Sequence, residues 1–209
     1  MNKKITGVTD LLKTITLAFI LSIFIRTTVA EARFIPSGSM LPTLLIDDRL
    51  FIEKVSHYTG SVDRGEIVVF YPPYLEPKND SFKNIFLRRV NLSKDIPLIK
   101  RVIGLPGETI EIKNNTVLIN GKPLKENSYI KEAPLYNMPA LKIPENEIFV
   151  MGDNRNDSAD SHIWGTLPVK NIIGHAVFRF WPLKRFGLFH DSWNIISEKE
   201  IILFLFSLF

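Results

Sequence analysis

The apolar residues of this chain form one long continuous stretch near the N-terminus and then a series of short runs. The long stretch covers residues 11–30 and has about the 20 residues that a helix needs to cross a bilayer. Beyond residue 32 the chain changes to short segments that alternate apolar and polar residues or are rich in β-branched ones, which is typical of strands. Segments of this kind occupy residues 49–55, 65–71, 109–113, 117–119, 147–151 and 175–180.

Turn-forming residues separate these segments. The 13 prolines and 11 glycines lie mostly between the predicted strands. Asn120-Gly121 follows residues 117–119, where it predicts a two-residue hairpin turn. The pattern therefore predicts a mainly β fold: one N-terminal transmembrane helix followed by an antiparallel β-sheet domain. Residues 114–144 contain the hairpin and four prolines, and we expect them to form a small inserted cap.

The charges around the apolar stretch predict how it lies in a membrane. Lys3, Lys4 and Lys13 precede its most apolar part, against the single acidic residue Asp10. The positive-inside rule then places the N-terminus in the cytoplasm and the rest of the chain outside. We expect a cytoplasmic N-terminus at residues 1–10, an anchor at 11–30 and an extracytoplasmic domain at 31–209.

Two other interpretations of the apolar stretch stay open at this point. It is also compatible with a cleavable signal peptide, because Ala30-Glu31-Ala32 has the small-x-small pattern of a cleavage site. A buried hydrophobic helix is the second alternative. The anchor is favoured because a serine-rich turn, residues 36–44, begins only a few residues later and cleavage would leave it close to a free end.

Two further segments stand apart from the predicted sheet. Residues 72–93 are polar and proline-containing, and we expect an exposed loop. Residues 201–209 are nearly all apolar but too short to span a bilayer. They are expected to form a helix that packs on the domain or lies in the membrane interface.

Composition excludes several kinds of chemistry. The net charge is +4 and no block of like charges indicates a nucleic-acid partner. The chain has no cysteine, so it has no thiol nucleophile, disulfide or thiolate metal site. Its 4 histidines are scattered and no HExxH motif occurs, which argues against a zinc hydrolase. We therefore expect no metal and no cofactor.

A serine and a lysine are the strongest candidates for catalysis. Ser39 lies in a turn that Pro36 and Pro42 make rigid. A rigid backbone holds the hydroxyl in one orientation, which favours its action as a nucleophile. Lys100 lies in an apolar strand, where burial disfavours the ammonium and lowers the pKa, so that the amine can act as a base. Taken singly, the turn also fits an ordinary surface loop and Lys100 an exposed edge-strand residue.

A polar loop supplies candidate supporting residues. Ser158 is a candidate hydrogen-bond partner that would orient the amine of Lys100. Asp153, Arg155 and Asp160 are predicted to form a charged network that holds the loop, in which Asp153 and Arg155 brace the turn at residues 152–154 electrostatically. No histidine and aspartate stand out as partners for a Ser-His-Asp triad.

Three segments, in this order after one apolar span, resemble the motifs of bacterial type I signal peptidases. PSGSMLPTL (36–44) is similar to the nucleophile motif of that family, KRVIGLPGE (100–108) to its general-base motif and GDNRNDSADS (152–161) to its third signature. Residues 179–182, RFWP, resemble a sequence near the end of its catalytic core. The match departs at Asn156-Asp157, whose order is often reversed, and at His162, where the family often has arginine.

The resemblance implies a role for each matching position. Ser39 would be the nucleophile, Lys100 the general base and Ser158 the residue that positions Lys100. The Ser37 hydroxyl and the Ser39 backbone N–H would form the oxyanion hole. Substrate would bind as an extended strand, with its small side chains in shallow apolar pockets. Those pockets would be lined by Ile35, Met40, Leu44 and Ile99.

The resemblance also implies a function and a location. The substrates would be secretory preproteins, cut after small-x-small sites at the outer face of the bacterial cytoplasmic membrane. The partners would be the lipid bilayer and the translocation machinery. Two alternatives remain: a self-cleaving Ser/Lys protease of the repressor type, which would carry a DNA-binding domain in place of the span, and a non-catalytic membrane-anchored β scaffold.

Overall fold

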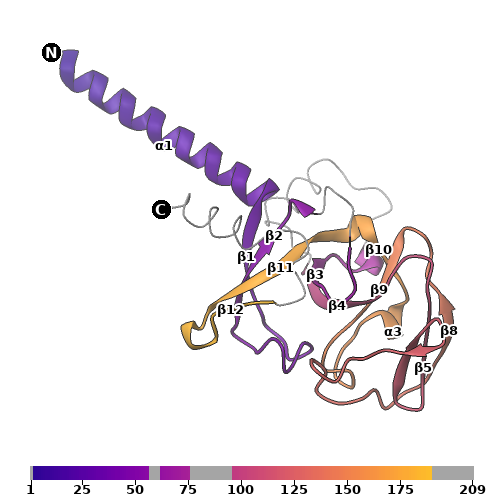
Figure 1. Cartoon of the computed structure of the whole chain (residues 1–209). Coiled ribbons are helices and arrows are strands. Elements are labelled where there is room, and N and C mark those ends of the chain that lie inside the picture. Colours follow the sequence, from indigo (N-terminus) through magenta and orange to yellow (C-terminus); the bar gives the residue numbers. More distant parts are fainter. Residues whose placement is uncertain (1, 57–61, 76–95, 190–209) are drawn as a thin grey trace.

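The computed structural model describes residues 2–56, 62–75 and 96–189. The predicted apolar tail at 201–209, most of the predicted loop at 72–93 and His57 lie outside the described residues. The described part is one long helix followed by antiparallel sheets (Figure 1), which confirms the mainly β fold class.

The N-terminal helix α1 (Asn2–Thr28) stands away from the sheets (Figure 1). Its segment Val8–Thr28 has a mean hydropathy of 1.9, which is long and apolar enough for a membrane span, and 0% of this segment is buried. That exposure argues against a buried core helix. The helix ends two residues before the expected boundary at residue 30, because Ala30 already pairs with Glu53 in the first strand.

The main sheet has 8 strands, and every paired neighbour runs antiparallel. Its order is β1-β2-β11-β3-β4-β9-β10, and β12 pairs with β11. The bounds are β1 Ala30–Phe34, β2 Arg49–Glu53, β3 Ile67–Phe70, β4 Leu98–Gly104, β9 Glu147–Met151, β10 Leu167–Pro168, β11 Ile172–Trp181 and β12 Gly187–Leu188. Short helical turns lie at α3 Ser161–Trp164, η2 Pro73–Leu75, η3 Val169–Asn171 and η4 Leu183–Arg185.

A second sheet of 4 strands, in the order β7-β6-β5-β8, lies at the end of the molecule away from α1 (Figure 1). Its strands are β5 Thr109–Lys113, β6 Thr116–Ile119, β7 Lys122–Pro123 and β8 Met138–Lys142. Asn120 and Gly121 connect β6 and β7 with φ values of 51° and 75°, as the predicted hairpin requires. The excursion from the main sheet starts at Thr109, before the expected residue 114, because β5 pairs with β6 and β8.

The core consists of three apolar clusters arranged by strand alternation. In β3, Val69 belongs to the cluster under the loop that carries Ser39, whereas Val68 and Phe70 belong to the cluster on the other face of the sheet. The third cluster joins the small sheet to β9 through Phe149 and Met151. Each fully buried aliphatic side chain contributes about 1.5–3 kcal/mol, so these clusters fix the sheet that positions the site.

Gly174 offers a test of how closely β11 and β2 approach each other. A Cβ atom at Gly174 would lie 2.1 Å from the Glu53 carbonyl oxygen, which is backbone and cannot move aside. We expect Gly174→Ala to lower the free energy of unfolding by about 2–3 kcal/mol, measured by urea denaturation in detergent micelles. Gly187→Ala is the matched control, because its Cβ would meet only the Arg185 carbonyl oxygen at 3.9 Å. Equal stabilities of the two variants would contradict this packing.

Candidate active site

Ser39 lies in the loop that connects β1 to β2. The loop is held to the core by Met40 and Leu44, which are both 0% exposed, and by the backbone bond from Leu44 N to Met40 O at 2.9 Å. Between these anchors, Ser39 is half-buried, so that its hydroxyl stays reachable. The apolar residues of the motif therefore fix the turn, and its serine remains partly accessible to solvent.

Lys100 lies in the middle of β4 and points at this loop. Its Nζ donates a hydrogen bond to Ser39 Oγ at 2.7 Å, across 61 positions of sequence. Side chains alternate along a strand, and the neighbouring Arg101 bonds Asp153 instead. The structure thus brings together the serine and the lysine that were singled out from the sequence.

Burial changes the acid–base properties of Lys100. The residue is 3% exposed, and desolvation lowers its pKa from 10.5 to about 8. The negative charges of Asp160 and Asp153 act in the opposite direction and limit the fall in pKa. At pH 7 about one amine in ten would be neutral, against about one in three thousand for a lysine of unshifted pKa. Lys100 is therefore able to accept a proton near neutral pH.

Two backbone carbonyls of the serine loop are held by Asn154. Its N–H donates to the Ser39 carbonyl at 3.0 Å and its Nδ2 to the Gly38 carbonyl at 3.1 Å. Asn154 was not among the residues that the sequence singled out. Its place directly after Asp153 in the segment GDNRNDSADS is the signal that would have pointed to it.

Gly152 and Ser158 complete this contact with the loop. A Cβ atom at Gly152 would lie 2.3 Å from Ser158 Oγ and 2.4 Å from the Ser39 carbonyl, so only glycine allows this approach. Ser158 therefore lies beside the serine loop. Its Oγ is buried and makes no hydrogen bond within the part of the chain that the structure describes.

The charged residues of the third motif find their partners in other segments of the chain. Asp153 forms two bonds to Arg101 in β4, at 2.9 and 2.8 Å. Arg155 is buried and pairs with Glu126 at 2.6 Å, while its Nε donates to the Gly152 carbonyl at 3.1 Å. The strand neighbour of Lys100 and the inserted segment thus supply the opposite charges for this loop.

Asp160 supports the site from the other end of the motif. Its carboxylate accepts from Gly152 N at 2.8 Å and caps α3 by accepting from His162 N at 3.2 Å. The ring Nδ1 of His162 lies 2.7 Å from the same carboxylate, and the Tyr136 ring stacks on the imidazole at 4.2 Å. His162, where the sequence departs from the motif of the resembling family, is thus a direct neighbour of Asp160 in the structure. His175 lies 3.0 Å from Glu66.

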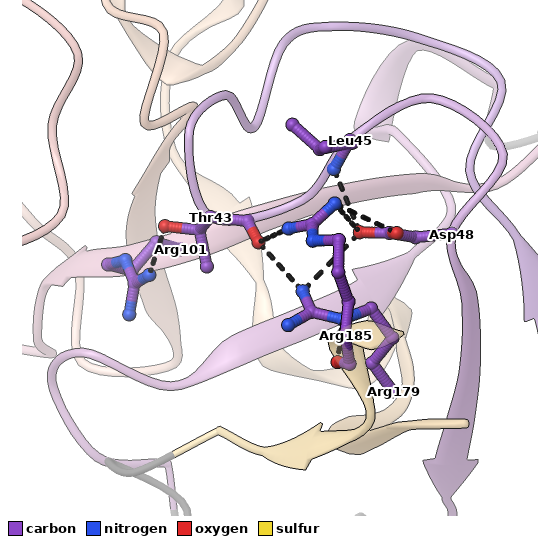
Figure 2. A network of polar contacts seen from close by, with 6 residues as sticks. All are labelled: Thr43, Leu45, Asp48, Arg101, Arg179 and Arg185. Carbon is purple, nitrogen blue, oxygen red and sulfur yellow. Dashed lines mark hydrogen bonds and ion pairs between the residues drawn. The ribbon is translucent and has the colours of Figure 1, made fainter. Parts of the chain in front are cut away.

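A second polar network holds the far end of the serine loop. Figure 2 shows Arg179 and Arg185 converging on Asp48 and on the Thr43 backbone. Their guanidinium groups donate to the Thr43 carbonyl at 3.1 and 3.2 Å, and Arg185 contacts both Asp48 oxygens at 3.0 Å. Asp48 also accepts from Leu45 N at 2.9 Å. Arg179 comes from the RFWP sequence, whereas the roles of Asp48 and Arg185 had no signal in the sequence.

The four residues expected to line the substrate pockets belong to one cluster beneath the loop. Ile35, Met40, Leu44 and Ile99 are at most 9% exposed and pack against one another and their neighbours. They form an apolar floor under Ser37 and Ser39, whose Oγ atoms are 3.4 Å apart. In the described ranges, no group of three or more histidine and carboxylate side chains is arranged to hold a metal ion.

Comparison with known proteins identifies the family of this chain. The family model described as signal peptidase, peptidase S26, matches residues 8–181. A signal peptidase I of Leptolyngbya laminosa is 50% identical over 177 residues, which cover 84% of this chain and 81% of that protein. The probable signal peptidase I-1 of a Synechocystis strain is 47% identical over 185 residues, or 88% of each chain. The thylakoidal processing peptidase 1 of Arabidopsis thaliana is 34% identical over 202 residues, 92% of this chain and 54% of that protein. The chain therefore belongs to the S26 family of signal peptidases.

Proposed function

We propose that this chain is a membrane-bound serine endopeptidase that removes N-terminal signal peptides from exported preproteins after small-x-small sites. Membership of the signal peptidase family supports the removal of signal peptides. One observation above all supports a serine–lysine mechanism: the buried Nζ of Lys100 lies 2.7 Å from Ser39 Oγ. The alternatives of a repressor-type protease and a non-catalytic scaffold lose their support, because the family match extends over most of the helix and all three motifs.

Acylation follows from this contact. The neutral amine of Lys100 takes the proton of Ser39 as Oγ attacks the carbonyl carbon of the −1 residue. A C–O bond forms and the carbonyl electron pair moves to oxygen. When the intermediate collapses, the peptide C–N bond breaks and the new amino terminus leaves with the proton from Lys100. The signal peptide remains esterified to Ser39.

Deacylation uses the same two residues. Lys100, neutral again, takes a proton from a water molecule as that water attacks the ester carbonyl. The tetrahedral intermediate collapses by breaking the bond to Oγ, and the proton passes from Lys100 to Ser39. The signal peptide leaves as a carboxylic acid, which then loses its proton to the solvent. A single base that accepts a proton and then donates it in each half-reaction is sufficient for the full cycle.

The negative charge on the carbonyl oxygen needs hydrogen-bond donors. We assign this role to the Ser37 hydroxyl and the Ser39 backbone N–H, and the 3.4 Å separation of the two serine Oγ atoms supports it. Ser158 is the proposed partner that orients Lys100, because its buried hydroxyl has a free donor beside the serine loop. Asp153, Arg155 and Asp160 act as structural supports. Ile35, Met40, Leu44 and Ile99 are the proposed apolar residues of the substrate pockets; Met40 and Leu44 are 0% exposed, so they would shape the pockets from beneath and not touch the substrate.

The location follows from α1. We propose that it spans the cytoplasmic membrane of a bacterium once, with residues 1–10 in the cytoplasm and the domain on the extracytoplasmic face. The apolar segment Val8–Thr28 and its lack of buried residues support a span. An Arabidopsis relative is named for the thylakoid, so the same topology would serve an internal photosynthetic membrane. Secretory preproteins, the lipid bilayer and the translocation machinery are the proposed partners.

The dyad is tested by removing each member separately. Ser39→Ala and Lys100→Met are each expected to lower kcat/KM for a preprotein by at least about 10³-fold, because neither half of the dyad works alone. Lys100→Met keeps the length of the buried side chain and also tests whether the fold depends on the amine. Circular dichroism serves as the control for folding, and sequencing of the product N-terminus identifies the cleavage site. Substantial cleavage by either folded variant would contradict the mechanism.

The pH dependence tests the state of Lys100. Since the neutral amine is the active form and its pKa is about 8, kcat/KM should rise with pH and reach half of its plateau near pH 8. The Asp160 charge raises this pKa, so Asp160→Asn should move the midpoint to lower pH. Initial rates on a soluble peptide substrate between pH 5 and 10, measured for both proteins, provide the comparison. A midpoint near about 6.5 in the wild type would point to a histidine base instead.

A further inference from the structure

The junction between the membrane helix and the catalytic domain contains buried charges that the proposed mechanism does not use. Helix α1 ends at Thr28 and β1 begins at Ala30, so one residue, Val29, connects them. Its N–H continues the helix by donating to the Ile25 carbonyl at 2.8 Å. Its carbonyl accepts from the backbone N–H of Lys54, the residue that follows β2, at 2.9 Å. The helix therefore passes into the edge strand of the main sheet without a linker.

The side chain of Lys54 joins both sides of this junction. Its Nζ donates to the Arg26 carbonyl in the last turn of α1 at 2.9 Å and lies 2.7 Å from Glu31 Oε2 in β1. Arg33 contacts the other oxygen of Glu31. Carbonyls in the last turn of a helix have no partner within the helix, and a cation there also interacts favourably with the helix dipole. One ammonium group thus bonds the end of α1 and the start of the sheet.

The burial of this group indicates a geometric role. The side chains of Lys54 and Glu31 are only 6% and 2% exposed. Desolvation of two charges offsets most of their attraction, so a buried ion pair adds little net stability compared with apolar residues of the same size. A buried ion pair instead favours a single geometry, because any other arrangement separates the two partners and leaves a buried charge unpaired. At this position the enforced geometry is the angle between α1 and the sheet.

We propose that Lys54 is a positioning residue that fixes the orientation of the catalytic domain on the bilayer, and with it the position of Ser39 relative to substrates held in the same membrane. The proposal rests on the proposed function. Ser39 follows Thr28, the last residue of the helix, by 11 positions, so it lies within about 40 Å of the end of the helix along the chain. A change of angle at Val29 would therefore move the reactive serine relative to the membrane surface.

The energetic reason is the high local concentration of a tethered substrate. Enzyme and substrate in one bilayer meet at an effective concentration that depends on whether their reactive groups can come together, and the advantage is lost when the geometry forbids it. Without the Lys54 ammonium, only the two backbone bonds of Val29 would hold the junction. The angle between α1 and the sheet would then vary more, and in few of these orientations would Ser39 lie at the distance from the membrane surface at which a tethered substrate presents its cleavage site. A soluble peptide approaches from any direction and does not depend on this angle.

The experiment compares tethered and soluble substrates with the full-length chain. Lys54→Met replaces the ammonium by an apolar group of similar length and leaves Arg33 paired with Glu31. In vesicles of phosphatidylethanolamine and phosphatidylglycerol, we expect kcat/KM for a membrane-inserted preprotein to fall about tenfold. For a soluble peptide with the same cleavage site, kcat/KM should stay within about twofold of the wild type. Lys113→Met, at an exposed position of β5, is the matched control and should change neither rate.

A second variant protects the test against a folding defect. Glu31→Gln keeps the side-chain volume and removes the charge that holds Lys54, and it should give the same selective loss, about threefold. Equal losses on both substrates in both variants, or unchanged rates on the tethered substrate, would overturn the role of Lys54. Failure of the wild type to cut either substrate would instead overturn the proposed function, so the two failures are distinguishable.

Discussion

The proposed mechanism depends on burial lowering the pKa of one lysine, so that a usable fraction of its amine is neutral near pH 7. Burial of Lys100 disfavours its ammonium form, whereas Asp160 and Asp153 favour it. Because desolvation is the larger effect, the pKa falls to about 8, and the same packing that lowers it brings the amine against Ser39. Asp153 is in turn neutralised by Arg101, the strand neighbour of Lys100, which limits how strongly that carboxylate can raise the pKa.

Holding the hydroxyl against this amine requires a rigid loop, and polar contacts fix the loop on both sides. Asn154 and Gly152 fix the carbonyls at Gly38 and Ser39. The arginines of β11 and η4 fix the Thr43 carbonyl and Asp48 (Figure 2). In each case backbone carbonyls of the loop receive donors from distant segments, so the backbone has little freedom and few side chains need to surround Ser39.

Buried polar groups also join the loop that carries Ser39 to helix α1 through the edge strand β1. Between α1 and Ser39 the chain consists of Val29, the edge strand β1 and a short turn. Val29 and β1 are hydrogen-bonded to β2 and to Lys54, the residue that follows it. Helix α1, the edge strand β1 and the loop that carries Ser39 are thus joined by a continuous series of hydrogen bonds. The proposed role of Lys54 builds on this continuity.

Local patterns in the sequence determined the strand segments, the hairpin at Asn120-Gly121 and the apolar helix, because alternation, turn chemistry and length are properties of neighbouring residues. Strands β1 and β8 had no such signal, since Glu31 and Arg33 occupy one and Pro139 the other. The motifs were also sufficient to single out Ser39 and Lys100 and to identify the family. Only the tertiary structure decided which charges meet: Arg101 with Asp153, Arg155 with Glu126, Arg185 with Asp48 and Lys54 with Glu31. The reason is that a charged side chain has the same local signature whatever its partner, and the partner is selected by strand order and register over tens of residues.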